Sequence, residues 1–231
     1  MRDWTPTAGD RARRARARLY RNIRHFFDER AVLEVETPAL ASHGVTDPNI
    51  ECVWVPGSGF LQPSPEYHMK RLLAAGSGPI YQIARVFRAG EQGQRHNPEF
   101  TLLEWYRPGF ALTELIDECL DLLEEVLTTK GREYWRYRQL FQQQLGLDPL
   151  TADTRELAEL VAQENAAPPV TERQPLLDWL LASRIEPALP RDRLVVVQDF
   201  PAEAAALARI EADPDDGVAV AQRFEVFFGG F

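Results

Sequence analysis

A stripe of apolar residues predicts a helix near the start of the chain, over residues 11–30. The apolar positions that recur there with helical spacing are Leu19, Ile23, Phe26 and Phe27. The arginines that share another face of this helix are Arg11, Arg14, Arg18 and Arg21. The apolar stripe should pack inward, and the basic face is either a solvated surface or a docking patch for an acidic partner.

Later segments alternate between strand-like and helix-like patterns. The segments expected as strands are 31–40, 50–55, 59–62, 79–87, 99–107, 193–200 and 218–228. The segments expected as further helices are 64–75, 113–130, 133–144, 154–164 and 172–183. Strands with hairpin-like spacing and flanking helices indicate an α+β fold with a largely antiparallel sheet. No repeat, linker or domain boundary is evident, so residues 1–231 are interpreted as one domain.

Proline, glycine and hydroxyl residues mark several of these boundaries. Pro38 should end its strand, because proline cannot donate to a ladder in the middle of a sheet. Gly57 suits the turn of the hairpin between residues 50 and 62. Ser64 and Pro65 suit the start of a helix, because serine caps free amides and proline is favoured at the first helical position. Thr113 is expected to cap the next helix.

Composition narrows the class of protein. The chain has 231 residues, of which 45% are hydrophobic, enough for a buried core. No run approaches the roughly 18 apolar residues of a membrane helix. The arginine-rich start is not followed by an apolar signal core, so we expect a cytoplasmic protein without membrane contact. The two cysteines have no CxxC spacing and are interpreted as reduced thiols.

Charge is distributed unevenly along the chain. The formal net charge is -9, which argues against extensive binding to a nucleic-acid backbone. Residues 1–30 nevertheless carry nine arginines against four acidic residues, so the remainder of the chain is strongly acidic. The basic surface therefore belongs to the first helix and not to the whole protein.

The alternation of residues in two predicted strands places a set of functional side chains on one face. If residues 79–88 and 99–107 pair, the residues that share this face include Gln82, Arg88, Phe100, Glu104 and Tyr106. An arginine can hold a phosphate or carboxylate with two hydrogen bonds, and a phenyl ring can stack on a purine. A carboxylate and a phenol can hold an ammonium group.

Glu104 is the unusual member of this set, because a buried carboxylate is costly unless a cation meets it. Two interpretations remain open from the residues alone. The cation is either a bound substrate, or it is Arg88 or another arginine within a packed sheet.

Familiar nucleotide and metal motifs are absent. The sequence contains no GxxxxGK[ST], no complete GxGxxG, no HExxH and no CxxC, so neither a P-loop nor a zinc site is indicated, and metal ligands cannot be named. Of the four histidines, only His96 lies in the polar loop between the two strands.

Three segments resemble the class II aminoacyl-tRNA synthetases of the lysine subgroup. Residues 85–107, which contain "RHNPEFTLLEW", resemble motif 2, and residues 32–40, "VLEVETPAL", resemble motif 1 with its proline at Pro38. Residues 64–73, "SPEYHMKRLL", resemble the start of the amino-acid-binding helix. Within the subgroup, the sequence is most similar to the elongation factor P lysine ligases, from about residue 14 to the end.

This resemblance implies an activity and partners. ATP and lysine, or (R)-β-lysine, would form an aminoacyl-adenylate, and the acyl group would pass to a lysine side chain of elongation factor P. Mg²⁺ and a fixed guanidinium would stabilise the charge of the transition state. The resemblance also implies a homodimer that forms through the motif 1 helix. Elongation factor P is expected to be acidic, which would suit the basic helix. The residues before motif 1 are too few for an anticodon-binding barrel, so no tRNA partner is expected.

The resemblance also assigns residues. Arg88 would be the catalytic arginine at the α-phosphate. The residues that would contact ATP are Arg88, Ala89, Gly90, Glu91, His96, Asn97 and Phe100, with Phe100 stacked on the adenine. The residues that would line the lysine pocket are Ser64, Pro65, Glu66, Glu104 and Tyr106.

Two departures from the family pattern stand out. The family usually has a glutamate two places after the motif 2 arginine, where this chain has Gly90. Either Glu91 takes the role beside the adenine through a shift of the loop, which we favour, or Gly90 contributes only backbone. Motif 3, a G-x-G-x-x-R pattern, is missing, so the 231-residue chain alone is expected to be inactive. A fragment of a lysyl-tRNA synthetase and a non-catalytic module that binds lysine or a nucleotide remain as alternatives.

Overall fold

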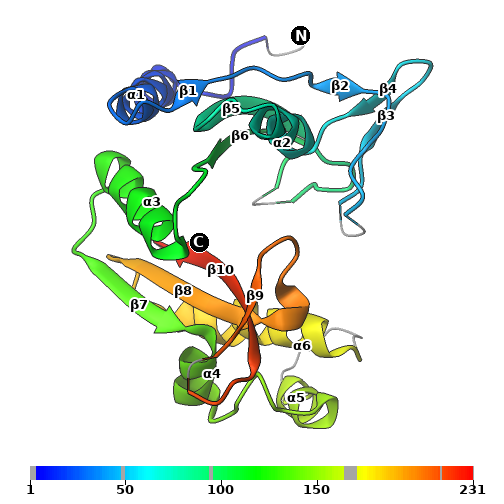
Figure 1. The fold of residues 1–231 in the computed structure, drawn as a ribbon, viewed down its shortest axis with the longest axis vertical. Helices are drawn as coiled ribbons and strands as arrows, with labels where there is room; N and C mark the ends of the chain where they lie inside the picture. The colour runs from blue at the N-terminus through cyan, green and yellow to red at the C-terminus, as the bar shows by residue number, and fades with distance from the viewer. Residues whose placement is uncertain (1–3, 48–49, 94–95, 164–170, 214, 231) are drawn as a thin grey trace. The chain divides into compact units, whose positions relative to one another are not determined.

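The computed structural model describes residues 4–47, 50–93, 96–163, 171–213 and 215–230 (Figure 1). The chain forms two compact units, Met1–Ala111 and Leu112–Phe231. Within the described ranges, no helix is both long and apolar enough to cross a membrane.

The first unit contains two helices and two small sheets. Its elements are α1 (Asp10–Asp28), β1 (Leu33–Glu34), β2 (Leu40–Ala41), β3 (Val53–Val55), β4 (Gly59–Leu61), α2 (Glu66–Ala74), β5 (Ile80–Phe87) and β6 (Glu99–Tyr106). One sheet has the order β1-β5-β6, in which β1 is parallel to β5 and β5 is antiparallel to β6. The other has the order β2-β4-β3 and is antiparallel throughout.

Helix α1 packs against one face of the β5–β6 pair. Ile23, Phe26 and Phe27 of its apolar stripe are buried, whereas Leu19, at the start of the stripe, is 38% exposed. Phe27 is fully buried, stacks on Tyr81 of β5 at 4.4 Å between ring centroids, and lies 5.8 Å from the ring of Trp105 of β6. At the polar edge of the helix, Arg24 donates to the Glu34 carboxylate at 2.9 Å. These contacts cover one face of the strand pair. The polar side chains of a binding site must therefore lie on its other face.

The basic face of α1 is exposed, as the sequence predicts. Of its four arginines, Arg14 pairs with Asp10 at 2.6 Å. The other three, Arg11, Arg18 and Arg21, have no ion pair with any residue that the structure describes.

The second unit is a four-stranded sheet with helices. Its elements are α3 (Leu112–Val126), β7 (Arg132–Arg136), α4 (Tyr137–Leu145), α5 (Thr154–Val161), α6 (Arg173–Leu180), the π-helix η1 (Leu181–Ile185), the 3₁₀ turns η2 (Glu186–Ala188) and η3 (Ala202–Ala204), β8 (Leu194–Pro201), β9 (Ile210–Ala212) and β10 (Ala219–Phe227). The strand order is β7-β8-β10-β9, with β7 parallel to β8 and the other pairs antiparallel.

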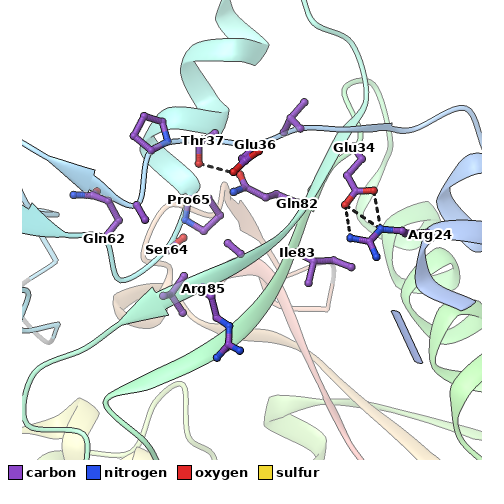
Figure 2. Close-up of a pocket in the computed structure, with 15 residues that line it drawn as sticks. Arg24, Glu34, Glu36, Thr37, Gln62, Ser64, Pro65, Gln82, Ile83 and Arg85 are labelled. Carbon is purple, nitrogen blue, oxygen red and sulfur yellow. Dashed lines mark hydrogen bonds and ion pairs between the residues drawn. The ribbon is translucent and has the colours of Figure 1, made fainter. Parts of the chain in front are cut away.

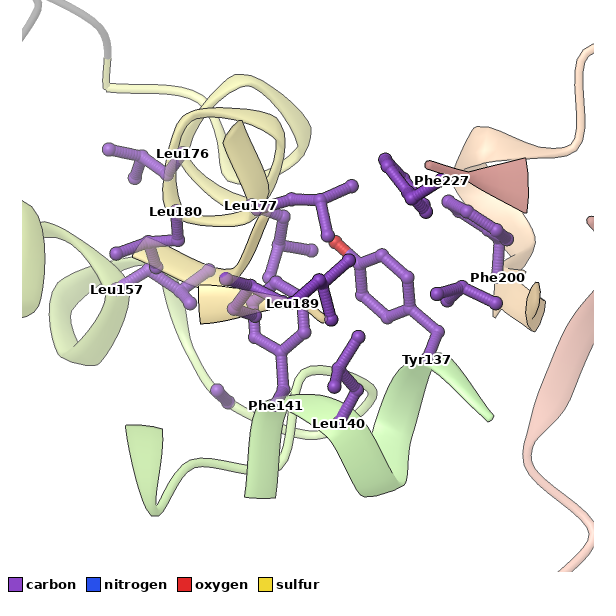
Figure 3. Packing of buried hydrophobic residues seen from close by; sticks show 14 of the residues in the cluster. Tyr137, Leu140, Phe141, Leu157, Leu176, Leu177, Leu180, Leu189, Phe200 and Phe227 are labelled. Carbon is purple, nitrogen blue, oxygen red and sulfur yellow. The ribbon is translucent and has the colours of Figure 1, made fainter. Parts of the chain in front are cut away.

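Strand β8 carries the core of this unit because both of its faces are buried. Val195 and Val197 join a large cluster with residues of α4, α5 and α6, among them Tyr137 and Leu177 (Figure 3). Val196 and its neighbour Leu194 pack instead with residues of α3. A continuous apolar run such as "LVVV" is typical of a strand that is covered on both sides.

The predicted fold class is confirmed, and several element boundaries differ. The hairpin, α2 and the β5–β6 pair form where the sequence places them, and Gly57 adopts the positive φ of its turn. Thr113 is not a cap, because α3 begins one residue earlier. The helix expected from residue 133 begins only at Tyr137, since the preceding five residues form β7. Residues 31–40 form two short strands, with Pro38 between them.

Candidate functional site

The register of β5 and β6 brings the expected side chains together. Gln82 lies opposite Glu104, and Val86 lies opposite Phe100. Because α1 covers the aromatic residues on the alternate positions, these residues belong to the face of the pair that is opposite α1. The common face that the alternation predicts is therefore confirmed.

Glu104 is held by two hydroxyl groups. Ser64 Oγ donates to one carboxylate oxygen at 2.6 Å, and the Tyr106 hydroxyl donates to the other at 2.6 Å. Burial, followed by the hydrogen bond to Glu104, raises the pKa of Tyr106 well above its usual value, so the phenol stays protonated and donates. No cation pairs with Glu104 among the residues that the structure describes. The alternative in which Arg88 neutralises Glu104 is therefore wrong.

The start of α2 is built into the same site. Ser64 Oγ also accepts the backbone N–H of Glu66 at 3.0 Å, so one hydroxyl both caps the helix and orients Glu104. Pro65 was expected at the first helical position, but it lies at the N-cap and α2 begins one residue later, at Glu66. Glu66 differs from Glu104, because its carboxylate already pairs with Lys70 at 2.6 Å.

Arg88 lies just after β5 and contacts several groups of the first unit. Its Nη1 lies 3.5 Å from the Glu91 carboxylate, and its Nε donates to the Pro63 carbonyl at 3.4 Å. The guanidinium also lies over the Phe100 ring, 5.0 Å from the centroid. The expected arginine and aromatic ring therefore meet, with the arginine half-buried and able to donate further hydrogen bonds.

The loop after Arg88 is anchored by backbone hydrogen bonds. The Ala89 N–H donates to the carbonyl of Glu51 at 2.8 Å, and the Gly93 N–H donates to the carbonyl of His96 at 3.0 Å. His96 and Asn97 are exposed. Within the described part of the loop, no side-chain hydrogen bond joins either of them to Arg88, so their expected contact with ATP stays a prediction.

A cavity of about 630 Å³ lies between β5 and the segment that follows β1 (Figure 2). The chain pairs with β5 as far as Val35 and then diverges, and Ser64 and Pro65 form part of the wall. Thr37 donates to the Gln82 side chain at 2.9 Å across this gap. Thr37 was missed in the sequence, where its only signal is its position directly before the motif 1 proline.

A second polar network forms part of the wall of this cavity, which Arg24 and Glu34 line. Arg24 lowers the pKa of Glu34, and the Tyr81 hydroxyl donates to the same carboxylate at 3.0 Å. Burial, followed by the bond to Glu34, raises the pKa of Tyr81 to about 12. This network ties α1 to both strands that border the cavity.

Sequence comparisons identify a family and several similar proteins. Residues 10–231 match the family of class II tRNA synthetases (D, K and N). A protein of Haemophilus influenzae is 44% identical over 100% of this chain and 73% of its own length, and one of Mannheimia succiniciproducens is 46% identical over 98% and 72%. A protein of Pasteurella multocida is 44% identical over 99% and 73%. All three bear the name elongation factor P--(R)-beta-lysine ligase.

Proposed function

Because this chain belongs to the class II tRNA synthetases (D, K and N), we propose that it activates (R)-β-lysine or lysine with ATP and transfers it to a lysine side chain of elongation factor P. The names of the relatives support this activity over a lysyl-tRNA synthetase and over a non-catalytic binding module. The family match extends across both compact units, which supports the proposal that they belong to one catalytic domain.

The observation that carries the proposal is the state of Glu104. Its two oxygens are fixed by Ser64 and Tyr106, but neither hydroxyl neutralises its charge. A fixed carboxylate with uncompensated charge suits the ammonium group of an amino acid, because a charge-assisted hydrogen bond is stronger than a neutral one. Glu66 supplies a second carboxylate at the start of α2 for the second ammonium group of lysine or β-lysine.

The first chemical step joins the amino acid to AMP. A carboxylate oxygen of the amino acid attacks the α-phosphorus of ATP, and the bond to pyrophosphate breaks. Negative charge grows on the oxygens of the α-phosphate, and the Arg88 guanidinium stabilises it. Phe100 would stack on the adenine and so fix the nucleotide relative to Arg88.

The second step transfers the acyl group. The neutral ε-amine of a lysine on elongation factor P attacks the acyl carbonyl, AMP leaves, and an amide bond forms with loss of a proton. Since a translation factor is the acceptor, we place this reaction in the cytoplasm.

Mg²⁺ would enter with the nucleotide and neutralise phosphate charge. Among the described residues, no group of three or more His, Cys, Asp or Glu side chains could hold a metal ion by itself. Magnesium usually keeps phosphate and water ligands beside one or two carboxylates. We therefore assign no protein ligand to it.

We also propose a homodimer and an acceptor that is not tRNA. Two leucines of the motif 1 region, Leu33 and Leu40, are 59% and 41% exposed, which supports burial of this segment against a second copy. Sedimentation at micromolar concentration should give twice the mass of the chain. Incubation with ATP, lysine or (R)-β-lysine and tRNA should leave the tRNA unacylated.

The deciding experiment measures both steps. A form of the protein that also contains a motif 3 should catalyse pyrophosphate exchange that depends on lysine or (R)-β-lysine, and should add the mass of one acyl group to elongation factor P, whereas residues 1–231 alone should show no exchange. Exchange with neither amino acid, or acylation of tRNA in preference to elongation factor P, would contradict the proposal.

A further inference from the structure

The turn after β5 contains a glycine whose missing side chain leaves room for another residue. Gly90 has φ +74°, a conformation that favours glycine. A Cβ at this position would have one heavy-atom neighbour within 4 Å, Oε2 of Glu51 at 3.8 Å. The Glu51 carboxylate therefore lies beside the place from which a residue 90 side chain would project.

Glu51 is fixed at this turn through its backbone. Its carbonyl accepts the Ala89 N–H at 2.8 Å, and strand β3 begins two residues later at Val53. On the other side of the turn, the Arg88 N–H donates to the Pro98 carbonyl at 2.9 Å. These two bonds hold the backbone of Glu51 and the loop of Arg88 side by side, so the Glu51 side chain starts next to the turn.

Two carboxylates of this region, those of Glu91 and Glu51, could contact a bound nucleotide. They differ in their ion-pair partners. Glu91 pairs with the Arg88 guanidinium at 3.5 Å. Glu51 is exposed and has no side-chain partner among the described residues. It also lines an open cavity of about 880 Å³ together with Thr46, Cys52 and Phe60. Of these two carboxylates, Glu51 is therefore the one without a cation among the described residues, and it can accept hydrogen bonds from a ligand.

We propose that Glu51 accepts a hydrogen bond from the 6-amino group of the nucleotide base and so selects ATP over a 6-oxo purine nucleotide. This inference rests on the proposed function, because it uses ATP as the substrate held by Arg88 and Phe100. An ionised carboxylate accepts hydrogen bonds and cannot donate them. It would be repelled by the triphosphate, so the groups of ATP that it can serve are the base amine and the ribose hydroxyls. Phe100 offers a ring for stacking near Arg88, which favours the base amine.

Inosine triphosphate is a suitable probe, because its base has an oxygen in place of the 6-amino group. That oxygen would face the Glu51 carboxylate with no hydrogen to share. Glu51→Ala should raise the KM for ATP about tenfold and lower the preference for ATP over inosine triphosphate by a similar factor. The KM for the amino acid should not change.

Glu51→Gln provides a sharper test than the alanine variant. The amide oxygen can still accept from the amine of ATP, and the amide nitrogen can donate to the oxygen of inosine triphosphate. The preference for ATP should therefore fall mainly because inosine triphosphate binds better. A residue with a merely structural role would not improve binding of the second nucleotide.

Two control variants separate Glu51 from its neighbours. Glu99→Gln changes another exposed carboxylate of the motif 2 strand, one that pairs with Arg85, and should keep the parental preference. Glu91→Ala removes the partner of Arg88 and should lower kcat with the nucleotide preference retained. Both nucleotides should also be titrated calorimetrically without amino acid, so that the result does not depend on turnover.

The outcomes distinguish this inference from the proposed function. Amino-acid-dependent exchange by the parent protein tests the function, whereas the ratio of the two nucleotide affinities in the variants tests Glu51. An unchanged ratio in both Glu51 variants would overturn the inference, as would loss of the preference in Glu91→Ala instead. If the Glu51 variants lost discrimination between ATP and 2′-deoxy-ATP and kept it against inosine triphosphate, the assignment to the base would be wrong.

Discussion

Glu104→Gln is the substitution that tests the substrate site most directly. The side chain keeps its shape, and the amide oxygen can still accept from one hydroxyl, while the charge that would bind the substrate ammonium is lost. Removing one side of a buried, hydrogen-bonded charge pair costs roughly 2–5 kcal/mol. At about 1.4 kcal/mol per factor of ten, the affinity for lysine or β-lysine should fall about thirtyfold to several-thousandfold. The affinity for ATP should change far less.

Although Glu104→Gln should weaken binding of the amino acid, it should not lower the stability of the protein without ligand. Glu104 is partly buried, and its two donors, Ser64 and Tyr106, are neutral. A glutamine in its place removes a desolvated charge, so the melting temperature without ligand should stay the same or rise. Had Glu104 been bound to an arginine, the variant would leave that arginine uncompensated and lower the melting temperature.

Thermal melts of parent and variant, with and without amino acid, give both results in one assay. The parent should gain a melting-temperature shift with lysine or β-lysine that the variant loses. Glu99→Gln is the matched control, because it removes an exposed charge from the same strand and should keep the shift. A variant that melts clearly earlier than the parent and still gains the parental shift would refute the assignment of Glu104.

Three further predictions concern the nucleotide, pH and the acceptor. In a form of the protein that contains a motif 3, Arg88→Ala should abolish amino-acid-dependent pyrophosphate exchange with an unchanged circular dichroism spectrum, and exchange at the parental rate would refute its role. Tyr81 has a folded pKa of about 12, above its ordinary value of 10, so its contribution to the free energy of unfolding is complete below pH 10 and is lost as the pH rises through 12. Urea denaturation between pH 9 and 11.5 should show this loss in the parent and a smaller one in Tyr81→Phe. Replacing Arg11, Arg18 and Arg21 by serine should slow association with elongation factor P and weaken its salt dependence, because exposed charges act mainly on encounter rates. Unchanged rates would make the basic face a solvated surface.

The paired strands could be predicted because two runs rich in apolar and aromatic residues flank a polar loop. Side chains alternate between the two faces of a strand, so the sequence could also assign Gln82, Phe100 and Glu104 to a common face, which the register of β5 and β6 bears out. Strand β7 was not predicted for the converse reason. Its sequence, "REYWR", carries charges and runs directly into α4, and its pairing with the distant β8 is invisible to a local pattern.

The composition of the site was easier to predict than its contacts. The alternation and the family resemblance both named Glu104 and Tyr106. Neither could show that Ser64, at the start of α2, would donate to Glu104, because that contact depends on how the helix packs against the strands. The approach of Glu51 to Gly90 is a long-range contact of the same kind, fixed by a backbone bond to Ala89.

The two carboxylates of the lysine pocket should respond differently to a substrate. Glu66 must share or release Lys70 before a substrate ammonium can approach it, so part of the gain on binding offsets a lost ion pair. That ion pair is partly exposed, and such pairs contribute only about 0–1 kcal/mol, so the exchange is inexpensive but adds little affinity. Among the residues that the structure describes, no cation pairs with Glu104, and its hydroxyl partners can remain in place when the ammonium arrives. From this difference in charge compensation we expect Glu104 to be the principal anchor of the amino acid, with Glu66 free to adjust to where the second amine lies.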